Sequence, residues 1–302
     1  MSAVRPEFHD STGDNPAPNK LFGYEILGSL AHGAGSMLYY VQPPDSDLVR
    51  VLKHVTIGAR RDKRFYEQLR TEFLISRRLE HPGLRRSIDM HVRRNWVGSV
   101  VEAALILERC EGVTLDQYVP PNTTERICIF LRAAMAVAAL NDLGYVHCDI
   151  KPSNIVITDQ ARAKVIDLGQ ACKIGSAKYR IQGTPNYMAP EQTRRDEMTA
   201  RTDVFCFGAT MYSALTRQAL PTLMTVGKRR KEELKEDNIR APNTFDPSIP
   251  EDLSALVMDC VQYKPKRRPR DMHEVANRLR AAGLASISRL EAGAPSPFDA
   301  GI

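Results

Sequence analysis

The sequence lacks any long run of apolar residues. Its longest stretch of small apolar side chains covers residues 133–140, whereas a membrane-spanning helix needs roughly 20 apolar residues. Residues 1–20 contain Pro, Asp and Asn where a secretory signal needs an apolar segment. We therefore expect a cytoplasmic protein without a membrane partner.

Closely spaced cysteine pairs are also missing. The cysteines are scattered along the chain and form no Cys-x-x-Cys motif. This spacing is typical of reduced thiols in a cytosol and argues against a disulfide framework or a zinc site. The cysteines are Cys110, Cys128, Cys148, Cys172, Cys206 and Cys260.

Aromatic residues are few, at 7% of the chain with a single tryptophan. The formal net charge is +6, and Lys and Arg gather at 60–64, 228–235 and 264–270. A basic balance can favour acidic partners or nucleic acid. No aromatic residues interleave with these runs to stack on bases, so we expect solvated helix faces and loops and no nucleic-acid partner.

What the sequence does contain is a strand-rich first part and a helical second part. Residues 24–30, 36–41, 49–55 and 103–110 are rich in β-formers. Apolar spacing of four and three residues predicts a helix at 65–79, with Glu72 and Ser76 on its apolar face. Further helices are predicted at 124–144 and between about 202 and 282, and strands at 154–158 and 163–169. The ends, 1–20 and 284–302, are expected to be loose.

The polar loop at 147–154 carries the strongest chemical signal. Asp149, Lys151 and Asn154 place a carboxylate, an ammonium and a carboxamide on one short loop before an apolar strand. These groups suit a hydroxyl nucleophile, a phosphoryl group in transfer and a metal ion, respectively. A plain polar loop with an Asx turn is the alternative interpretation.

Three other charged residues stand out. Asp167 follows a predicted strand, and the hairpin before it would bring its carboxylate to the same end as Asp149. Glu72 lies on an apolar helix face and Lys53 closes a strand, where an unpaired charge is costly. A Lys53–Glu72 ion pair would satisfy both residues; the alternative is that each side chain reaches solvent separately.

In their order along the chain, these motifs resemble the protein kinase family, specifically the bacterial and eukaryotic-like Ser/Thr kinases. The resemblance covers residues 22–282. It implies a two-lobed α+β fold with a five-stranded antiparallel N-lobe at 21–109, a mainly helical C-lobe at 110–283 and an active site between them. It also implies transfer of the γ-phosphate of ATP to Ser or Thr hydroxyls of a protein substrate, autophosphorylation included.

The resemblance gives roles to residues of the N-lobe. Lys53 would hold the α- and β-phosphates of ATP and pair with Glu72. Leu107 would be the gatekeeper of the nucleotide site, and the backbones of Glu108 and Cys110 would meet adenine.

Residues of the C-lobe receive roles in the same way. Asp149 would orient the substrate hydroxyl and accept its proton, and Lys151 would steady the γ-phosphate. Asn154 and Asp167 would bind Mg²⁺.

The segment 183–191 resembles the substrate-docking loop of the family and its Ala-Pro-Glu end. Thr184 matches the position that helps hold the catalytic aspartate, and Asp203 matches the buried aspartate that braces the catalytic loop. Arg268 would pair with Glu191.

The glycine loop departs from the family pattern. Within 31–38 only Gly33 keeps its place and Gly35 is shifted beside it, while Ala31 and Ser36 stand where glycines are usual. Side chains can hinder the approach of backbone N–H groups to phosphate. Because Ala and Ser are small, we expect weakened rather than abolished ATP binding.

Two further residues, one a thiol and one a hydroxyl, also depart from the pattern. Cys148 replaces the arginine that pairs with a loop phosphate in many kinases, so we expect constitutive activity or control by a partner; a large loss of turnover in Ser176→Ala would contradict this. Ser76 stands where an apolar residue is usual and would loosen the helix around Glu72. Cys148 and Cys172 both fall near the predicted cleft, where inert buried thiols are commoner than a redox switch.

Two other functions compete with a protein kinase. A pseudokinase would bind nucleotide or act as a scaffold, and only the glycine loop and Ser76 favour it. A small-molecule kinase on a related fold is disfavoured because 183–191 resembles a peptide-docking surface. Every metal and base residue is present, so we predict an active Ser/Thr kinase.

Overall fold

The computed structural model describes residues 19–33, 35–58, 63–158, 162–222 and 239–293. The chain forms two compact units. The first unit comprises Met1–Glu80 and Arg85–Cys110, and the second comprises His81–Leu84 and Glu111–Ile302.

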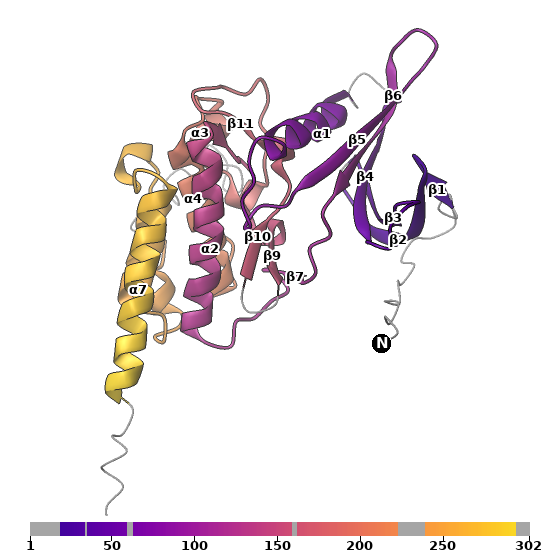
Figure 1. The fold of residues 1–302 in the computed structure, drawn as a ribbon. Coiled ribbons are helices and arrows are strands. Elements are labelled where there is room, and N and C mark those ends of the chain that lie inside the picture. The colour runs from indigo at the N-terminus through magenta and orange to yellow at the C-terminus, as the bar shows by residue number, and fades with distance from the viewer. Residues whose placement is uncertain (1–18, 34, 59–62, 159–161, 223–238, 294–302) are drawn as a thin grey trace, which may run out of the picture. The chain divides into compact units, whose positions relative to one another are not determined.

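The first unit contains an antiparallel sheet with the strand order β1-β2-β3-β4-β6-β5 (Figure 1). Its strands are β1 (Lys20–Leu21), β2 (Tyr24–His32), β3 (Met37–Gln42), β4 (Arg50–Thr56), β5 (Ser87–Arg94) and β6 (Val100–Leu107). The expected count of five strands was one too low, because the short β1 pairs with the start of β2. The helix α1 (Lys63–Ser76) lies alongside the sheet.

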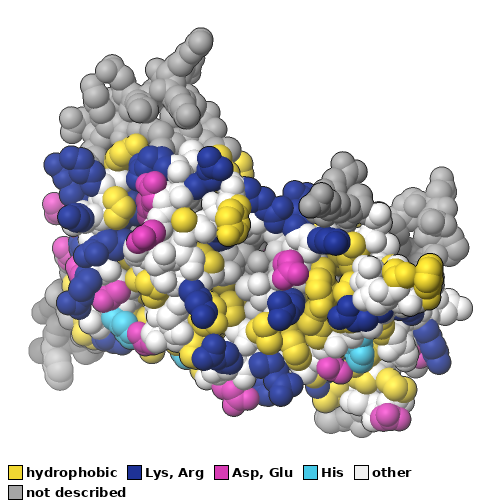
Figure 2. Space-filling model, turned by 90° about the horizontal axis from the view of Figure 1, so that it is seen from above, with side chains coloured by type: hydrophobic (Ala, Val, Ile, Leu, Met, Phe, Trp, Pro, Cys, Tyr) yellow, Lys and Arg dark blue, Asp and Glu magenta, His cyan; other side chains and the backbone are white. Residues whose placement is uncertain are grey.

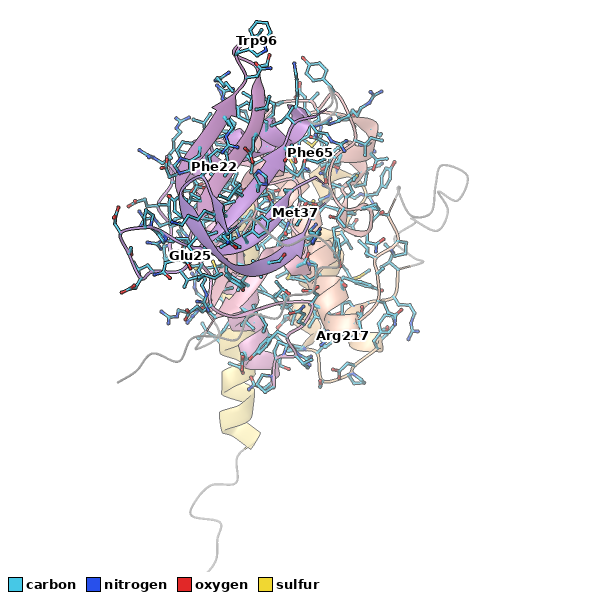
Figure 3. All side chains as sticks on the ribbon, turned by 90° about the vertical axis from the view of Figure 1, so that its right-hand side faces the viewer. Phe22, Glu25, Met37, Phe65, Trp96 and Arg217 are labelled. Carbon is cyan, nitrogen blue, oxygen red and sulfur yellow. The ribbon has the colours of Figure 1, made fainter. Side chains whose placement is uncertain are left out.

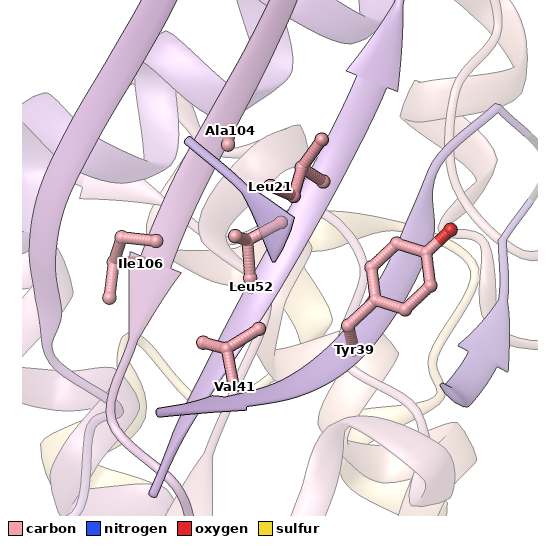
Figure 4. Close-up of a cluster of buried hydrophobic side chains, with 6 residues drawn as sticks. All are labelled: Leu21, Tyr39, Val41, Leu52, Ala104 and Ile106. Atoms are coloured by element: carbon pink, nitrogen blue, oxygen red, sulfur yellow. The ribbon is translucent and has the colours of Figure 1, made fainter. Parts of the chain in front are cut away.

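Both faces of this sheet bury apolar side chains. One face carries Leu21, Tyr39, Val41, Leu52, Ala104 and Ile106 (Figure 4). The other carries Val51, Val55, Ala103, Leu105 and Leu107, which pack with Leu69 of α1. Consecutive residues such as Val51 and Leu52 enter opposite clusters because side chains alternate across a strand. This explains why the central strands have continuous apolar sequences.

The edge strand β5 had no sequence signal. Most of its side chains are exposed or half-exposed, and several are charged. It ends in a hairpin whose tip exposes 96% of Trp96 (Figure 3). An edge strand with one solvated face needs few apolar residues, so its composition resembles that of a loop.

The second unit is mainly helical, and α2 and α7 lie side by side in it (Figure 1). Its helices are α2 (Thr123–Asp142), α3 (Pro190–Arg194), α4 (Ala200–Thr216), α6 (Glu251–Cys260) and α7 (Met272–Gly293). Its strands form the sheets β10-β9-β7 and β11-β8. They are β7 (Val113–Thr114), β8 (Tyr145–Val146), β9 (Ile155–Thr158), β10 (Arg162–Val165) and β11 (Cys172–Lys173).

The predicted helix at 124–144 is confirmed as α2, which begins after a side-chain cap. The Asn122 side chain accepts a hydrogen bond from the Glu125 N–H at 2.8 Å, and Gly144 follows the helix with a φ of +86°. A left-handed residue after the last turn is a common helix stop and suits glycine. The turn predicted at Asp159-Gln160 lies outside the described residues.

The loose ends predicted at 1–20 and 284–302 fall largely outside the described residues. Within them, Lys20 belongs to β1 and α7 continues to Gly293. The last helix is therefore longer than the sequence pattern indicated. Among the described residues, no helix is long and apolar enough to cross a membrane. On the face drawn in Figure 2, described Lys and Arg side chains are spread among acidic and apolar ones.

Candidate active site

The first unit contains the predicted Lys53–Glu72 ion pair. Lys53 lies in β4, between Leu38 of β3 and Leu105 of β6. Its Nζ lies 3.0 Å from Glu72 Oε2, and Glu72 is only 2% exposed. A buried carboxylate needs such a partner because desolvation is costly. The pair fixes an ammonium group on the central part of the sheet.

A second cation, which sequence reasoning missed, also binds Glu72. Arg85 Nη2 lies 3.2 Å from Glu72 Oε1, and both side chains are buried. Each carboxylate oxygen therefore has its own cationic donor. The Arg85-Arg86 pair follows α1 in a loop without periodicity, so nothing in the sequence separated the buried arginine from its exposed neighbour.

Ser76 ties α1 to the sheet rather than loosening the helix. It is the last residue of α1, and its Oγ accepts a hydrogen bond from the Ser87 N–H at 2.7 Å. Ser87 begins β5. The hydroxyl at this position therefore joins the end of the helix that carries Glu72 to the edge strand. This bond argues against the expected loosening of the helix.

The glycine loop is closely packed where the structure describes it. The Gly33 N–H donates to the Ser36 carbonyl at 2.7 Å, closing a tight turn after Ala31 and His32 of β2. A Cβ at Gly35 would lie 2.1 Å from the ring of Phe65 on α1 (Figure 3). Gly35 is therefore required by packing against α1. The roles of Ala31, Gly33, Gly35 and Ser36 toward ATP stay predictions.

The segment predicted to contact adenine follows β6 directly. Leu107 is the last residue of the strand and is fully buried. The Glu108 N–H donates to the Arg86 carbonyl at 2.9 Å, and Cys110 is half-buried. The contacts of Glu108 and Cys110 with adenine stay predictions.

In the second unit, Asp149 is the centre of a hydrogen-bonded cluster. Its Oδ1 accepts from Thr184 Oγ1 at 2.9 Å, and its Oδ2 lies 3.4 Å from Lys151 Nζ. Lys151 Nζ also donates to Thr184 Oγ1 at 3.0 Å. The structure thus brings together the carboxylate and the ammonium of one loop with the threonine of a distant segment. The predicted role of Thr184 in holding the aspartate is confirmed.

Asn154 and Asp167 lie at one end of the β9–β10 hairpin. The Ile166 N–H donates to the Asn154 carbonyl at 2.9 Å, so Asp167 follows directly after the residue paired with Asn154. Asn154 Nδ2 donates to the Asp149 carbonyl at 2.8 Å, which leaves its side-chain oxygen as the acceptor. Asp167 adopts a left-handed conformation with a φ of +66°.

This donor set fits a magnesium ion. A carboxamide oxygen and a carboxylate are hard ligands of the kind Mg²⁺ prefers, and Mg²⁺ commonly binds few protein groups together with phosphates. Among the described residues no three His, Cys, Asp or Glu side chains cluster as a metal site.

The backbone before Asp149 is held by a buried carboxylate. Asp203 accepts hydrogen bonds from the N–H groups of His147 and Cys148 at 2.8 and 3.0 Å. Asn141 Nδ2 donates to the same carboxylate at 2.9 Å. Burial raises the pKa of Asp203, while these donors act in the opposite direction. The predicted bracing role of Asp203 is confirmed.

Comparison with known proteins agrees with this geometry. The sequence profile of the protein kinase domain matches residues 24–278. The chain belongs to the protein kinase family. This membership confirms the predicted two-lobed kinase fold.

Named relatives of this kinase come from several bacteria. It is 29% identical over 268 residues to the serine/threonine-protein kinase PknB of Mycobacterium tuberculosis, covering 85% of this chain and 42% of that protein. It is 27% identical over 249 residues to the serine/threonine-protein kinase pkn2 of Myxococcus xanthus, covering 76% of this chain and 29% of that protein. It is 25% identical over 266 residues to the tyrosine-protein kinase MasK of Myxococcus xanthus, covering 81% of this chain and 40% of that protein. The chain thus spans less than half the length of these relatives.

The segment that resembles a substrate-docking loop is anchored by a buried ion pair, as predicted. Arg268 donates to both carboxylate oxygens of Glu191, at 2.7 and 3.0 Å, and neither side chain is appreciably exposed. Gln192, which the sequence analysis did not single out, donates to the Cys148 carbonyl at 2.7 Å. The residue that directly follows Ala-Pro-Glu is therefore bonded to the loop that carries Asp149.

Proposed function

We propose that the protein is an ATP-dependent serine/threonine kinase. The observation that carries this proposal is the Asp149–Lys151–Thr184 cluster, with its 2.9, 3.0 and 3.4 Å contacts. A base and a cation held together by a third group are what transfer of a phosphoryl group to a hydroxyl requires.

In this reaction the hydroxyl oxygen of the substrate forms a bond to the γ-phosphorus as the bond to the β-phosphate oxygen breaks. Asp149 accepts the hydroxyl proton at its carboxylate. Lys151 donates hydrogen bonds to the transferring group and offsets its negative charge, because charge is delocalised over the phosphoryl oxygens. Thr184 orients both side chains through its hydroxyl.

The other groups bind and orient ATP. The Lys53 ammonium, fixed by Glu72, holds the α- and β-phosphates. Asn154 and Asp167 would hold Mg²⁺, which would neutralise negative charge on the phosphates when bound. Leu107 and the backbone of Glu108 and Cys110 would receive the adenine ring, as the family resemblance implies.

Serine and threonine are the acceptors that the site favours. Lys151 and Thr184 are typical of Ser/Thr kinases, and their side chains are hydrogen-bonded at 3.0 Å. The named relatives include both Ser/Thr kinases and the tyrosine kinase MasK. Phosphoamino-acid analysis of the labelled product tests the assignment, and a product containing only phosphotyrosine would refute it.

We also propose a cytoplasmic location. The cysteines that the structure describes are all free thiols, and free thiols persist in a reducing compartment.

The test of the enzyme is transfer of label from ATP, with magnesium, to a generic basic protein. Asp149→Asn and Lys53→Met should each abolish transfer. Asp142→Asn and Lys63→Met, which alter exposed side chains of the same types, should leave it unchanged. Full transfer by Asp149→Asn would refute the proposed mechanism. ATP binding without transfer in the unaltered protein would favour the pseudokinase instead.

A further inference from the structure

Two cysteine thiols face each other beside the candidate active site. Cys148 Sγ and Cys172 Sγ are 3.6 Å apart. Cys148 directly precedes Asp149, and Cys172 begins β11, five residues after Asp167. The proposed mechanism uses neither thiol, although each lies on a segment that carries a proposed functional carboxylate.

We propose that Cys148 and Cys172 form an oxidation site, and that closing it to a disulfide switches the kinase off reversibly. The effect on activity rests on the proposed function, whereas formation of the bond does not.

The local fold places both residues so that a bond can form. The strands β8 and β11 pair antiparallel, with Cys172 opposite Val146, two residues before Cys148. Met198 and Val146 pack around the Cys148 thiol. A disulfide requires an S–S distance of about 2.05 Å, so the gap of 3.6 Å must close by ~1.5 Å.

The two thiols differ in reactivity. Cys148 is buried, and its pKa is raised by its hydrogen bond with Cys172 and by desolvation. Cys172 is half-buried, and its pKa is lowered by the hydrogen bond from Cys148 and by the ammonium of Lys178, against the opposing effects of burial and Asp203. The thiolate is the reactive form, so Cys172 is the first thiol to be oxidised and Cys148 the one that resolves the product.

The oxidant is a peroxide. The Cys172 thiolate attacks one oxygen of hydrogen peroxide, the O–O bond breaks, and the leaving hydroxide takes a proton to become water. The Cys148 thiol then attacks the sulfenic sulfur as its proton leaves, the S–O bond breaks, and a second water departs. Two thiols and one peroxide thus give one disulfide and two waters, and an added dithiol reverses the change.

The new bond must disturb the site because the backbone of Cys148 is already fixed. Its N–H is bound by Asp203 and its carbonyl by Gln192, and its φ is +66°, which few side chains adopt. The ~1.5 Å closure therefore displaces either Asp149 or the segment that follows Asp167. A misplacement of about 1 Å can cost roughly 100-fold in rate, so we expect at least a tenfold loss of turnover.

The experiment treats the reduced protein with a small excess of hydrogen peroxide, blocks free thiols and maps peptides by mass spectrometry. Phosphoryl transfer is measured before oxidation, after it and after dithiothreitol. Cys172→Ser removes the attacking thiol while leaving Cys148 beside Asp149. Cys128→Ser removes another half-buried thiol, on α2, and is the matched control.

We expect a peptide linked through Cys148 and Cys172 in the unaltered protein and in Cys128→Ser, with activity lost and then restored by reductant. Cys172→Ser should form no such link and keep its activity in peroxide. Absence of the linked peptide, or a linked protein with full activity, would overturn the proposal. The peptide map is readable in an inactive protein, so failure of the proposed function is distinguishable from failure of the switch.

Discussion

Replacing Arg268 by methionine should destabilise the second unit strongly. The guanidinium is inaccessible to solvent and binds both oxygens of Glu191. It also donates to the carbonyls of Gln262, Arg201 and Tyr263 at 2.7, 2.8 and 3.1 Å. Methionine fills a similar volume but leaves a buried carboxylate and three carbonyls without these donors.

Breaking a buried pair on one side typically costs about 3–5 kcal/mol, because the remaining charge stays desolvated. We therefore expect Arg268→Met to lower the free energy of unfolding by about 4 kcal/mol. Lys266→Met, at a nearby exposed position, should change it by less than about 0.5 kcal/mol.

The assay is urea unfolding followed by circular dichroism, with a double-mutant cycle. In Arg268→Met/Glu191→Met both charges are gone, so stability should recover part of the loss. A loss below about 1 kcal/mol in Arg268→Met, or no recovery in the double variant, would refute the view that desolvated charge dominates this pair.

The first unit offers two further predictions. Arg85→Met should lower the free energy of unfolding of the first unit by about 2 kcal/mol, because a hydrogen bond between charged groups is lost at Glu72. It should also raise KM for ATP, because Glu72 fixes the Lys53 ammonium. Arg86→Met, a change at an exposed arginine, should do neither; equal effects at both positions would contradict the role of Arg85. Gly35→Ala should cost about 1–3 kcal/mol by overpacking against Phe65, measured by thermal unfolding. Phe65→Ala should remove that cost, and a persistent cost would point to backbone strain instead.

The sequence predicted best those parts of the site whose chemistry depends on short spacing. Asp149, Lys151 and Asn154 lie within one loop, so their side chains converge wherever that loop goes. Lys53 and Glu72 were predictable for another reason, since a charge at an apolar position needs a partner.

The features that the sequence did not reveal depend on tertiary contacts. Arg85 and Arg86 are chemically identical, and only the position of α1 decides which of them reaches Glu72. Ser76 stands on a helix face where an apolar residue is usual, yet its hydroxyl accepts a hydrogen bond from the first N–H of β5. Because β5 has no apolar pattern, the sequence did not indicate this partner. Hydrogen bonds between segments distant in sequence leave no periodic signal.

The proximity of the two thiols is likewise a tertiary contact that the sequence did not reveal. The hydrogen bonds around Cys148 connect these thiols to catalysis. Asp203 on α4 holds the N–H of Cys148, and Gln192 on α3 holds its carbonyl. These bonds position Asp149, and they also prevent Cys148 from moving freely toward Cys172. The rigidity that orients the proposed catalytic base is therefore what would make oxidation of the neighbouring thiol costly to activity. A looser backbone at Cys148 would absorb the disulfide, but it would also hold the base less firmly.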